Sequence, residues 1–215
     1  HISEYAHSMG NAVRNLQDYW DAIESTNFFM GGAIWDWADQ SFWNYDKQSG
    51  VKYMGYGGDF GDRPNDHTFC MNGIVFPNHT PKPQYYEVKK VYQNAGIKLT
   101  DNGEIEIFNK RYFLALDDLQ IQVSLWEDGK QISSYIHPKM EIAARQSKRF
   151  KPQLDLSTLK ADKEYFIKVQ LLLDKDMPWA KKGYVQMEEQ LPLKAASKNR
   201  YIAEEAKSSK GLSVS

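Results

Sequence analysis

The sequence predicts an α/β segment followed by an all-β domain. Residues 1–35 fit a strand, an amphipathic helix and a second strand, which is one step of a parallel sheet. From residue 97 apolar and polar residues alternate with a period of two, as in an antiparallel sheet with one buried face. The change of period places a boundary near residue 95, so we expect domains over 1–95 and 96–195. The Lys-, Ser- and Glu-rich stretch over 196–215 is expected to be a linker or mobile tail.

The helix of the first segment is predicted from the spacing of its apolar residues. They lie three, four and three positions apart, and they are Val13, Leu16, Trp20 and Ile23. Asn11 is the expected N-cap of this helix. The apolar run over residues 28–35 then predicts a strand that is buried on both faces of a parallel sheet.

Residues 38–85 are rich in Gly and Pro and show little periodicity. A long irregular segment of this kind either carries function or hides elements that the pattern does not reveal. A closing helix is predicted over residues 85–93, and Gly96 is expected in the left-handed position that commonly ends a helix.

The second domain is predicted to be an antiparallel β-sandwich of immunoglobulin-like size. Alternating runs indicate strands over residues 97–99, 105–108, 119–125 and 165–171. Asp128-Gly129 is a strong hairpin signal, because both residues tolerate the left-handed backbone of a type I′ turn.

Composition excludes several classes of protein. The 215 residues carry 27 basic and 28 acidic side chains, which argues against nucleic acid or an anionic membrane as the main partner. No apolar run approaches the roughly 18 residues of a membrane span. The one cysteine excludes an internal disulfide and a cysteine zinc cluster. The sequence opens on His1 without a targeting signal, so we expect a fragment of a longer protein.

Polar and aromatic residues follow the two predicted strands of the first segment. Glu4 lies at the end of the first strand, and Trp35-Asp36-Trp37 lies at the end of the second. Parallel strands end at a common edge, which in α/β barrels carries the catalytic groups. Aromatic faces stack on sugar rings, and His7 could bind a hydroxyl. The structural alternatives are a strand-end carboxylate in an ion pair, packing of the tryptophans at the rim and an ordinary loop histidine.

Four motifs, in this order, resemble the large bacterial β-galactosidases of glycoside hydrolase family 2. They are EYAHSMGN at 4–11, WDWADQ at 35–40, YGGDFGD at 56–62 and ND at 65–66 continuing through FCMNG at 69–73. The resemblance covers roughly residues 2–83, and residues 97–195 are similar in pattern and position to the domain that follows. It implies the C-terminal portion of a TIM (β/α)8 barrel followed by the sandwich.

The resemblance also implies roles for individual residues. Glu4 matches the catalytic nucleophile, and His7, Trp35 and Asn72 match positions that contact galactose. Sodium ligands are implied at the Phe69 carbonyl and at Asn72, and a weaker match places Asn65 near a second divalent ion. The magnesium ligands and the acid/base Glu of the family match no segment of this chain and are expected upstream.

The implied function is part of a retaining β-galactosidase, which needs a nucleophilic and a proton-donating carboxyl group. Asp36 and Asp39 are the nearest substitutes for the missing acid, and we expect neither to serve, so the chain alone is expected to be inactive. The expected partners are a small galactoside, the remainder of its own chain and further copies in a homo-oligomer, in the bacterial cytoplasm or periplasm. The alternative is a non-catalytic carbohydrate-binding or scaffolding module.

Overall fold

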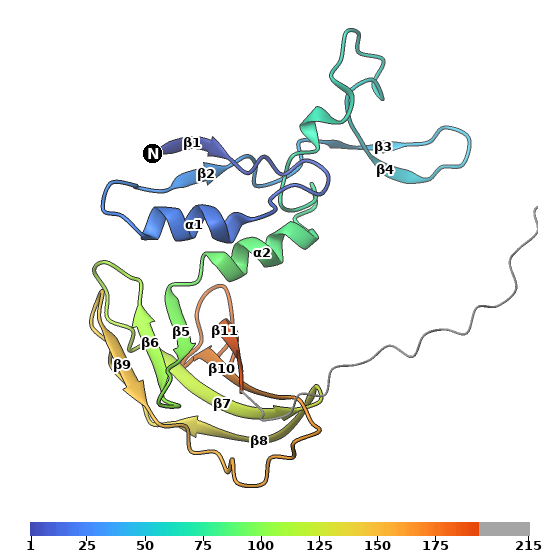
Figure 1. The fold of residues 1–215 in the computed structure, drawn as a ribbon. Helices are drawn as coiled ribbons and strands as arrows, with labels where there is room; N and C mark the ends of the chain where they lie inside the picture. The colour runs from blue at the N-terminus through green and yellow to red at the C-terminus, as the bar shows by residue number, and fades with distance from the viewer. Residues whose placement is uncertain (194–215) are drawn as a thin grey trace, which may run out of the picture. The chain divides into compact units, whose positions relative to one another are not determined.

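The computed structural model describes residues 1–193, and the chain divides into two compact units, His1–Gln93 and Asn94–Ser215 (Figure 1). The predicted tail at 196–215 lies outside the described residues. No helix in the described part of the chain is long and apolar enough to cross a membrane.

The first unit contains one parallel strand pair with two helices packed beside it. Its main elements are β1 (Ile2–Tyr5), α1 (Leu16–Glu24), β2 (Gly32–Ile34) and α2 (Pro83–Val91). β1 pairs with β2 in parallel, and α1 connects them, so the predicted strand–helix–strand step is confirmed. Its buried core consists of Tyr5, Val13, Leu16, Ile74, Val75 and Val91.

Two details of the predicted step are wrong. The helix begins after Asn15 and not after Asn11, because Val13 and Asn15 have left-handed backbone angles that a helix cannot include. The second strand is three residues long and is not buried on both faces. Phe28 and Met30, which the predicted strand included, precede β2 and are 93% and 83% exposed.

A β-hairpin that the sequence pattern did not reveal lies inside the irregular segment. β3 (Phe42–Tyr45) and β4 (Lys52–Gly55) pair antiparallel, and the 3₁₀ helix η1 (His67–Cys70) follows. The hairpin turn is closed by a hydrogen bond from the Asp46 N–H to the Val51 carbonyl, at 2.9 Å. The aromatic residues of β3 and Gly50 in the turn are the signals that could have identified it.

The closing helix is confirmed, with different ends. α2 begins at Pro83, two residues before the predicted start, because proline is well suited to the first turn of a helix. The helix ends at Val91 with Tyr92 as its C-cap. Gly96 lies in a strand, so the prediction that it ends the helix is wrong.

The second unit is an antiparallel sandwich of a three-stranded and a four-stranded sheet, as predicted. The smaller sheet has the order β5 (Ala95–Leu99), β6 (Ile105–Asn109), β9 (Ser147–Phe150). The larger sheet has the order β11 (Val185–Pro192), β10 (Tyr165–Leu173), β7 (Leu119–Glu127), β8 (Lys130–His137). β8 is the second strand of the hairpin predicted at Asp128-Gly129, whereas β9 and β11 were not predicted. Both unpredicted strands lie at the edge of a sheet and have one strand partner each.

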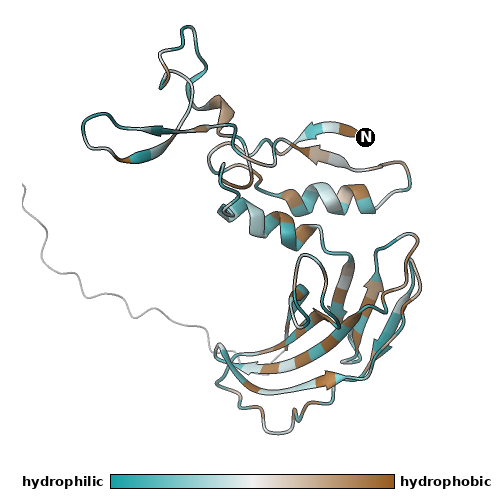
Figure 2. Cartoon of the chain, turned by 180° about the vertical axis from the view of Figure 1, so that it is seen from behind, coloured by the Kyte–Doolittle hydropathy of each residue, from teal (hydrophilic) through white to brown (hydrophobic). Residues whose placement is uncertain are grey.

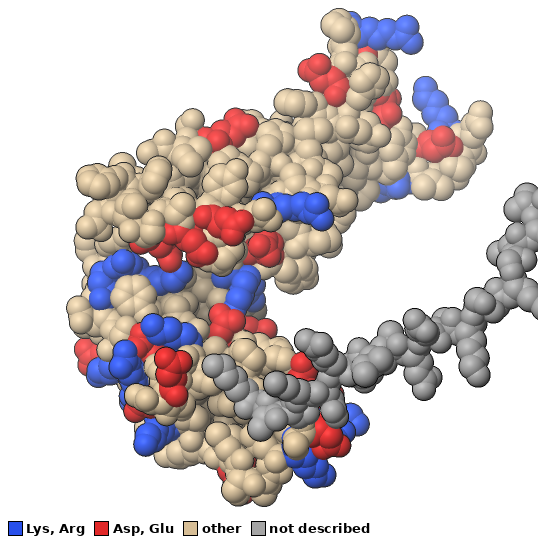
Figure 3. Space-filling view, in the orientation of Figure 1, with Lys and Arg blue, Asp and Glu red and all other residues tan. Residues whose placement is uncertain are grey.

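Alternating side chains from both sheets form the sandwich core, and Figure 2 shows the alternation along the strands. Fully buried members include Ile105, Ile107, Val123, Ile167, Val169 and Leu171. The turn between β7 and β8 has φ angles of 45° at Asp128 and 77° at Gly129, which confirms the predicted hairpin. Acidic and basic side chains are interspersed on the face of this unit that Figure 3 shows.

Three charged residues lie opposite one another across the smaller sheet. Glu106 of β6 is paired in register with Lys98 of β5 and Arg149 of β9. One oxygen of the Glu106 carboxylate lies 3.1 Å from the Lys98 ammonium, and the other accepts a hydrogen bond from the Arg149 guanidinium. The bond from Arg149, followed by that from Lys98, lowers the pKa of Glu106 below its ordinary value of 4.5.

We therefore expect Glu106→Gln to weaken the acid dependence of stability. A carboxyl whose pKa is lowered by folding stabilises the native state above its unfolded pKa, and this contribution is lost as the pH falls through the folded pKa. Wild type should be more stable than the variant at pH 7, and the difference should shrink towards pH 3. Urea unfolding across this pH range measures it, with the exposed Glu141→Gln as the control. If wild type and Glu106→Gln differed in stability by the same amount at pH 7 and at pH 3, the lowered pKa of Glu106 would be contradicted.

Candidate active site

The parallel pairing of β1 and β2 brings the first two candidate residues to one edge of the sheet. Tyr5 is in register with Ile34, so Glu4 and Trp35 both lie where these strands end. β1 is irregular between Ile2 and Tyr5, and both of these side chains pack in the core beside the helices. Glu4, between them, is exposed and lies outside this core.

Tyr5 anchors the strand that carries Glu4. Its hydroxyl lies 2.6 Å from the hydroxyl of Tyr92 and accepts a hydrogen bond from the Trp20 indole at 2.8 Å. Burial, and then the contact with Tyr5, raises the pKa of Tyr92, which keeps the Tyr92 hydroxyl protonated. Tyr5 thus connects β1 to α1, through Trp20, and to the C-cap of α2, which is Tyr92.

Ser8 connects the ends of both strands to the segment around Asn72. The left-handed backbone of Ala6, with φ 47°, turns the chain after β1. The Ser8 N–H then donates to the Trp35 carbonyl at 2.7 Å, and the Ser8 hydroxyl donates to the Asn72 carbonyl. Ser8 is fully buried. Sequence reasoning missed this residue, and its place between His7 and the following glycine-containing loop was the only signal.

His7 and Phe69 are in contact. Their ring centroids lie 5.6 Å apart, with His7 half-buried and Phe69 57% exposed. The contact brings η1 to the loop after β1. His7, predicted to contact galactose, and Phe69, predicted to ligate sodium through its carbonyl, are 62 positions apart in the sequence and are neighbours in the structure.

Asn72 has the most distinctive environment of the candidates. It is 2% exposed, and its backbone carbonyl accepts hydrogen bonds from the Ser8 hydroxyl and from the Asp36 N–H. Its side-chain oxygen is buried and has no hydrogen-bond partner within residues 1–193. A buried carbonyl oxygen without a partner is unfavourable, so this atom suits a cation or a hydroxyl group supplied by a ligand.

Asn65 is held in a local turn and is not joined to the other candidates by any of the described contacts. Its side chain donates to the Asp62 carbonyl at 2.9 Å and accepts from the His67 N–H at 3.1 Å. Gly57 and Gly58 pack closely against it, and a β-carbon on either would lie within 3.4 Å of the Asn65 side chain. Over residues 1–193, no three His, Cys, Asp or Glu side chains form a metal-binding group.

The two aspartates nearest the candidate site are both held by hydrogen bonds, and the second oxygen of Asp39 is buried without a partner within residues 1–193. The Asp36 carboxylate accepts from the Trp37 N–H at 2.5 Å and from the Gln40 amide at 3.0 Å. The Asp39 carboxylate accepts from the Gly73 N–H at 2.8 Å and pairs with Lys82 at 2.6 Å. Neither arrangement resembles a free carboxylic acid that is ready to protonate a leaving group.

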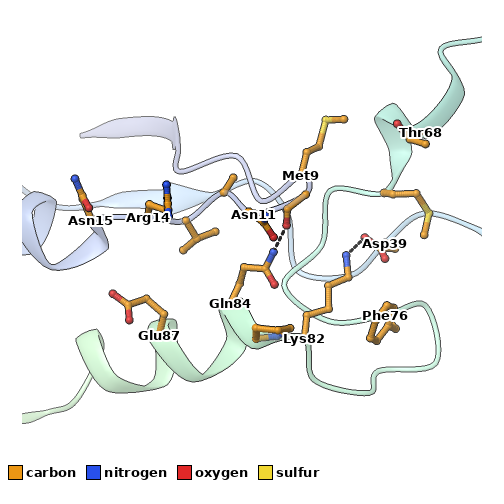
Figure 4. Close-up of a pocket in the computed structure, with 15 residues that line it drawn as sticks. Met9, Asn11, Arg14, Asn15, Asp39, Thr68, Phe76, Lys82, Gln84 and Glu87 are labelled. Atoms are coloured by element: carbon orange, nitrogen blue, oxygen red, sulfur yellow. Dashed lines mark hydrogen bonds and ion pairs between the residues drawn. The ribbon is translucent and has the colours of Figure 1, made fainter. Parts of the chain in front are cut away.

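A cavity of about 820 Å³ lies between the loop that precedes α1 and the start of α2 (Figure 4). Asp39, Lys82 and Gln84 line it, and the Gln84 amide donates to the Gly10 carbonyl. Glu4, His7 and Trp35 do not line this cavity. The cavity is therefore separate from the candidate site, although Met71 and Thr68, the neighbours of Asn72 and Phe69, contribute to its wall.

Comparison with known proteins identifies both units. Residues 1–97 match the family model "Glycosyl hydrolases family 2, TIM barrel domain", and residues 105–194 match "Beta-galactosidase, domain 4". The chain belongs to glycoside hydrolase family 2. The predicted resemblance is confirmed, and so is the fold class: the C-terminal part of a TIM barrel followed by a β-sandwich domain.

Curated relatives of this family 2 chain are much longer than the chain itself. It is 40% identical over 191 residues to a β-galactosidase of Vibrio cholerae, an alignment that covers 88% of the chain and 18% of the relative. It is 37% identical over 194 residues to a β-galactosidase of Psychromonas ingrahamii, covering 89% of the chain and 19% of the relative. A Priestia megaterium β-galactosidase is 34% identical over 200 residues, which is 91% of the chain and 19% of that protein. The chain thus spans less than a fifth of each of these relatives.

We expect Tyr5→Phe to destabilise the region that holds Glu4. The change removes the hydroxyl that the Trp20 indole and Tyr92 share, and leaving buried polar groups unpaired costs about 1–3 kcal/mol. Hydrogen exchange at the amides of α1 should become faster by a corresponding factor. Tyr45→Phe is the control, because Tyr45 is 59% exposed. Equal exchange rates in the two variants would show that the shared hydroxyl does not anchor β1.

Proposed function

We propose that this chain is the end of the catalytic barrel and the following sandwich of a retaining β-galactosidase, in which Glu4 is the nucleophile. The observation that supports the proposal best is the parallel pairing of β1 and β2, which places exposed Glu4 and Trp35 at one sheet edge. The curated relatives are named β-galactosidases, which supports terminal β-D-galactosides as the substrate class.

In the proposed reaction the Glu4 carboxylate attacks the anomeric carbon of the galactoside. The bond from that carbon to the leaving oxygen breaks, and the oxygen takes a proton from a carboxylic acid elsewhere in the enzyme. Water then attacks the same carbon of the glycosyl ester while the carboxylate that gave the proton takes one back from this water, and galactose and the Glu4 carboxylate are released. Because Asp36 and Asp39 are engaged in other contacts, we assign the acid to a part of the barrel outside this chain.

Trp35 and His7 are proposed to bind the sugar. Trp35 is 42% exposed, so part of its indole is free to pack against the apolar face of a pyranose. The half-buried His7 imidazole, supported by the Phe69 ring, can exchange hydrogen bonds with a hydroxyl group.

We propose that Asn72 and the Phe69 carbonyl hold a sodium ion. The side-chain oxygen of Asn72 supports this proposal, because it is buried and has no partner within residues 1–193. The Phe69 carbonyl is proposed from the resemblance and is an oxygen ligand of the kind that hard cations prefer. A bound sodium ion would supply positive charge that orients a hydroxyl of the galactoside. Asn65 remains a weaker proposal for a divalent ion, and any magnesium ligands are assigned to the rest of the enzyme.

The proposal requires further polypeptide to complete the barrel. A (β/α)8 barrel has eight parallel strands in about 250 residues, whereas the first unit contributes one parallel pair. We propose that the remainder of the same chain supplies the other strands and that the complete enzyme is a homo-oligomer. The exposure of Phe28 and Met30 is consistent with surfaces that other parts of the protein cover.

The decisive experiment is Glu4→Gln in the full-length protein encoded by the gene. Loss of the nucleophile should lower kcat for an aryl β-galactoside by about 10³-fold or more, with little change in unfolding temperature. A 2-deoxy-2-fluorogalactoside with a good leaving group should label the wild-type peptide that contains Glu4, as detected by mass spectrometry. The exposed Glu24→Gln serves as the matched control. Full activity in the Glu4 variant, or labelling of another residue, would overturn the assignment.

The 215-residue chain by itself should not hydrolyse the same substrate, because Asp36 and Asp39, the aspartates nearest the candidate site, are held in other contacts. Activity that depends on Glu4 in this chain would show that the acid lies within it, and Asp36 and Asp39 would then be tested. Binding of galactose without hydrolysis, lost in Trp35→Ala, is the result expected of a carbohydrate-binding module and would favour that alternative.

A further inference from the structure

The segment that carries Asn72 is held against the end of β2 by backbone hydrogen bonds. The Asp36 N–H donates to the Asn72 carbonyl at 2.7 Å, and the Ile74 N–H donates to the Asp36 carbonyl at 3.0 Å. The Ala38–Val75 bridge continues this pairing in parallel. Residues 72–75 therefore extend the sheet edge at which Glu4 and Trp35 lie.

Asp39 adds a side-chain bond to this arrangement. Its carboxylate reaches the N–H of Gly73 at 2.8 Å, and this N–H belongs to the peptide group whose carbonyl is that of Asn72. Both ends of one peptide unit are thus fixed, the carbonyl by Ser8 and Asp36 and the N–H by Asp39. The Asp39 side chain is completely buried, so water does not compete for this bond.

Lys82 holds the Asp39 carboxylate in place. Its ammonium group lies 2.6 Å from the oxygen that Gly73 also uses, its side chain is only 11% exposed, and its own N–H donates to the Ile74 carbonyl (Figure 4). Lys82 is the N-cap of α2, where the helix dipole disfavours a positive charge. A buried ion pair is also weak evidence for stability. Stabilisation of the fold is therefore a weak explanation for the Asp39–Lys82 ion pair. Positioning of the Asn72–Gly73 peptide is a better one.

Gly73 shows how closely these segments approach. A β-carbon at this position would lie 2.2 Å from the backbone of Ala38 and Asp39, so only glycine fits. The position of the Asn72–Gly73 peptide relative to the end of β2 consequently has little freedom. A shift of the Asp39 carboxylate would be transmitted directly to Asn72.

We propose that Asp39, held by Lys82, is a positioning residue for Asn72. Its carboxylate fixes the Asn72–Gly73 peptide and thereby directs the unpartnered side-chain oxygen of Asn72 towards the cation and sugar that it binds. The inference rests on the proposed function for the identity of those ligands. It assigns a role in ligand affinity to two residues that do not touch the substrate.

The test compares two double variants that both lack the ion pair. Asp39→Asn with Lys82→Met keeps an acceptor for the Gly73 N–H, whereas Asp39→Leu with Lys82→Met removes it. Both replace a buried pair by neutral side chains of similar size, which folds generally tolerate. A role in stability alone would affect both variants alike, and a positioning role separates them.

Sodium affinity is the first readout, measured in the inactive Glu4→Gln background of the full-length protein. The rise of the unfolding temperature with NaCl, at ionic strength held constant with choline chloride, gives the apparent Kd, and ²³Na line broadening checks it. We expect the Leu/Met variant to bind sodium about tenfold more weakly than the Asn/Met variant, as is typical when a supporting partner of a metal ligand is lost. In the active background KM should rise by a similar factor, with kcat within about threefold.

Equal sodium affinity and equal KM in the two double variants would overturn the positioning role. Asp118→Asn is the control, since it breaks an ion pair within the second unit, between Arg111 and Asp118. If the Leu/Met variant does not fold, Asp39→Ser with Lys82→Met replaces it, because the shorter hydroxyl withdraws the acceptor. Failure of the proposed function itself would differ: wild type would show no stabilisation by sodium, and Glu4→Gln would retain activity.

Discussion

The peptide group between Asn72 and Gly73 is the point on which the candidate site depends. Its carbonyl accepts hydrogen bonds from Ser8, after β1, and from Asp36, after β2, and its N–H donates to Asp39. Three stretches that are far apart in the sequence meet at one rigid planar group. The parallel pairing of β1 and β2 brings the ends of these two strands to one edge of the sheet. The hydrogen bonds of the Asn72–Gly73 peptide then hold residues 72–75 against that edge.

Different kinds of contact hold the two units in their folded structures. The sandwich has a continuous core from two sheets, with Ile107, Val123 and Val169 completely buried. The first unit has a smaller core and exposes Phe28 and Phe42. In this unit, polar contacts also fix the positions of the elements. An example is the Tyr5 hydroxyl, which forms hydrogen bonds with both Tyr92 and Trp20. Because polar contacts are directional, they specify geometry more narrowly than apolar burial does.

The sequence was informative about elements with strong periodicity. The strands around residues 121 and 167, the Asp128-Gly129 turn and the helix that includes Leu16 were all predicted from local pattern. β9, β11 and the β3–β4 hairpin were not predicted, because pairing with a neighbour and not side-chain alternation defines them. The start of α1 was misplaced because Val13 has a left-handed backbone that its residue type disfavours.

The candidate site was located by motif resemblance, and its internal contacts were beyond prediction. Nothing local in the sequence indicates that Ser8 donates to Asn72 or that Asp39 pairs with Lys82, since these partners are 64 and 43 positions apart. The contact of His7 with Phe69 is likewise a product of the tertiary fold. Motifs indicate which residues are candidates for the site, and only the folded structure shows which of these residues are in contact.

The close approach at Gly73 also restricts how this scaffold can be altered in the laboratory. A randomised library that includes position 73 would consist almost entirely of misfolded members, because any β-carbon there overlaps the backbone of Ala38 and Asp39. The side chain of Trp37 is 55% exposed and has no such limit. Randomised positions in such a library therefore belong at exposed side chains of this kind, with the Asn72–Gly73 peptide left unchanged.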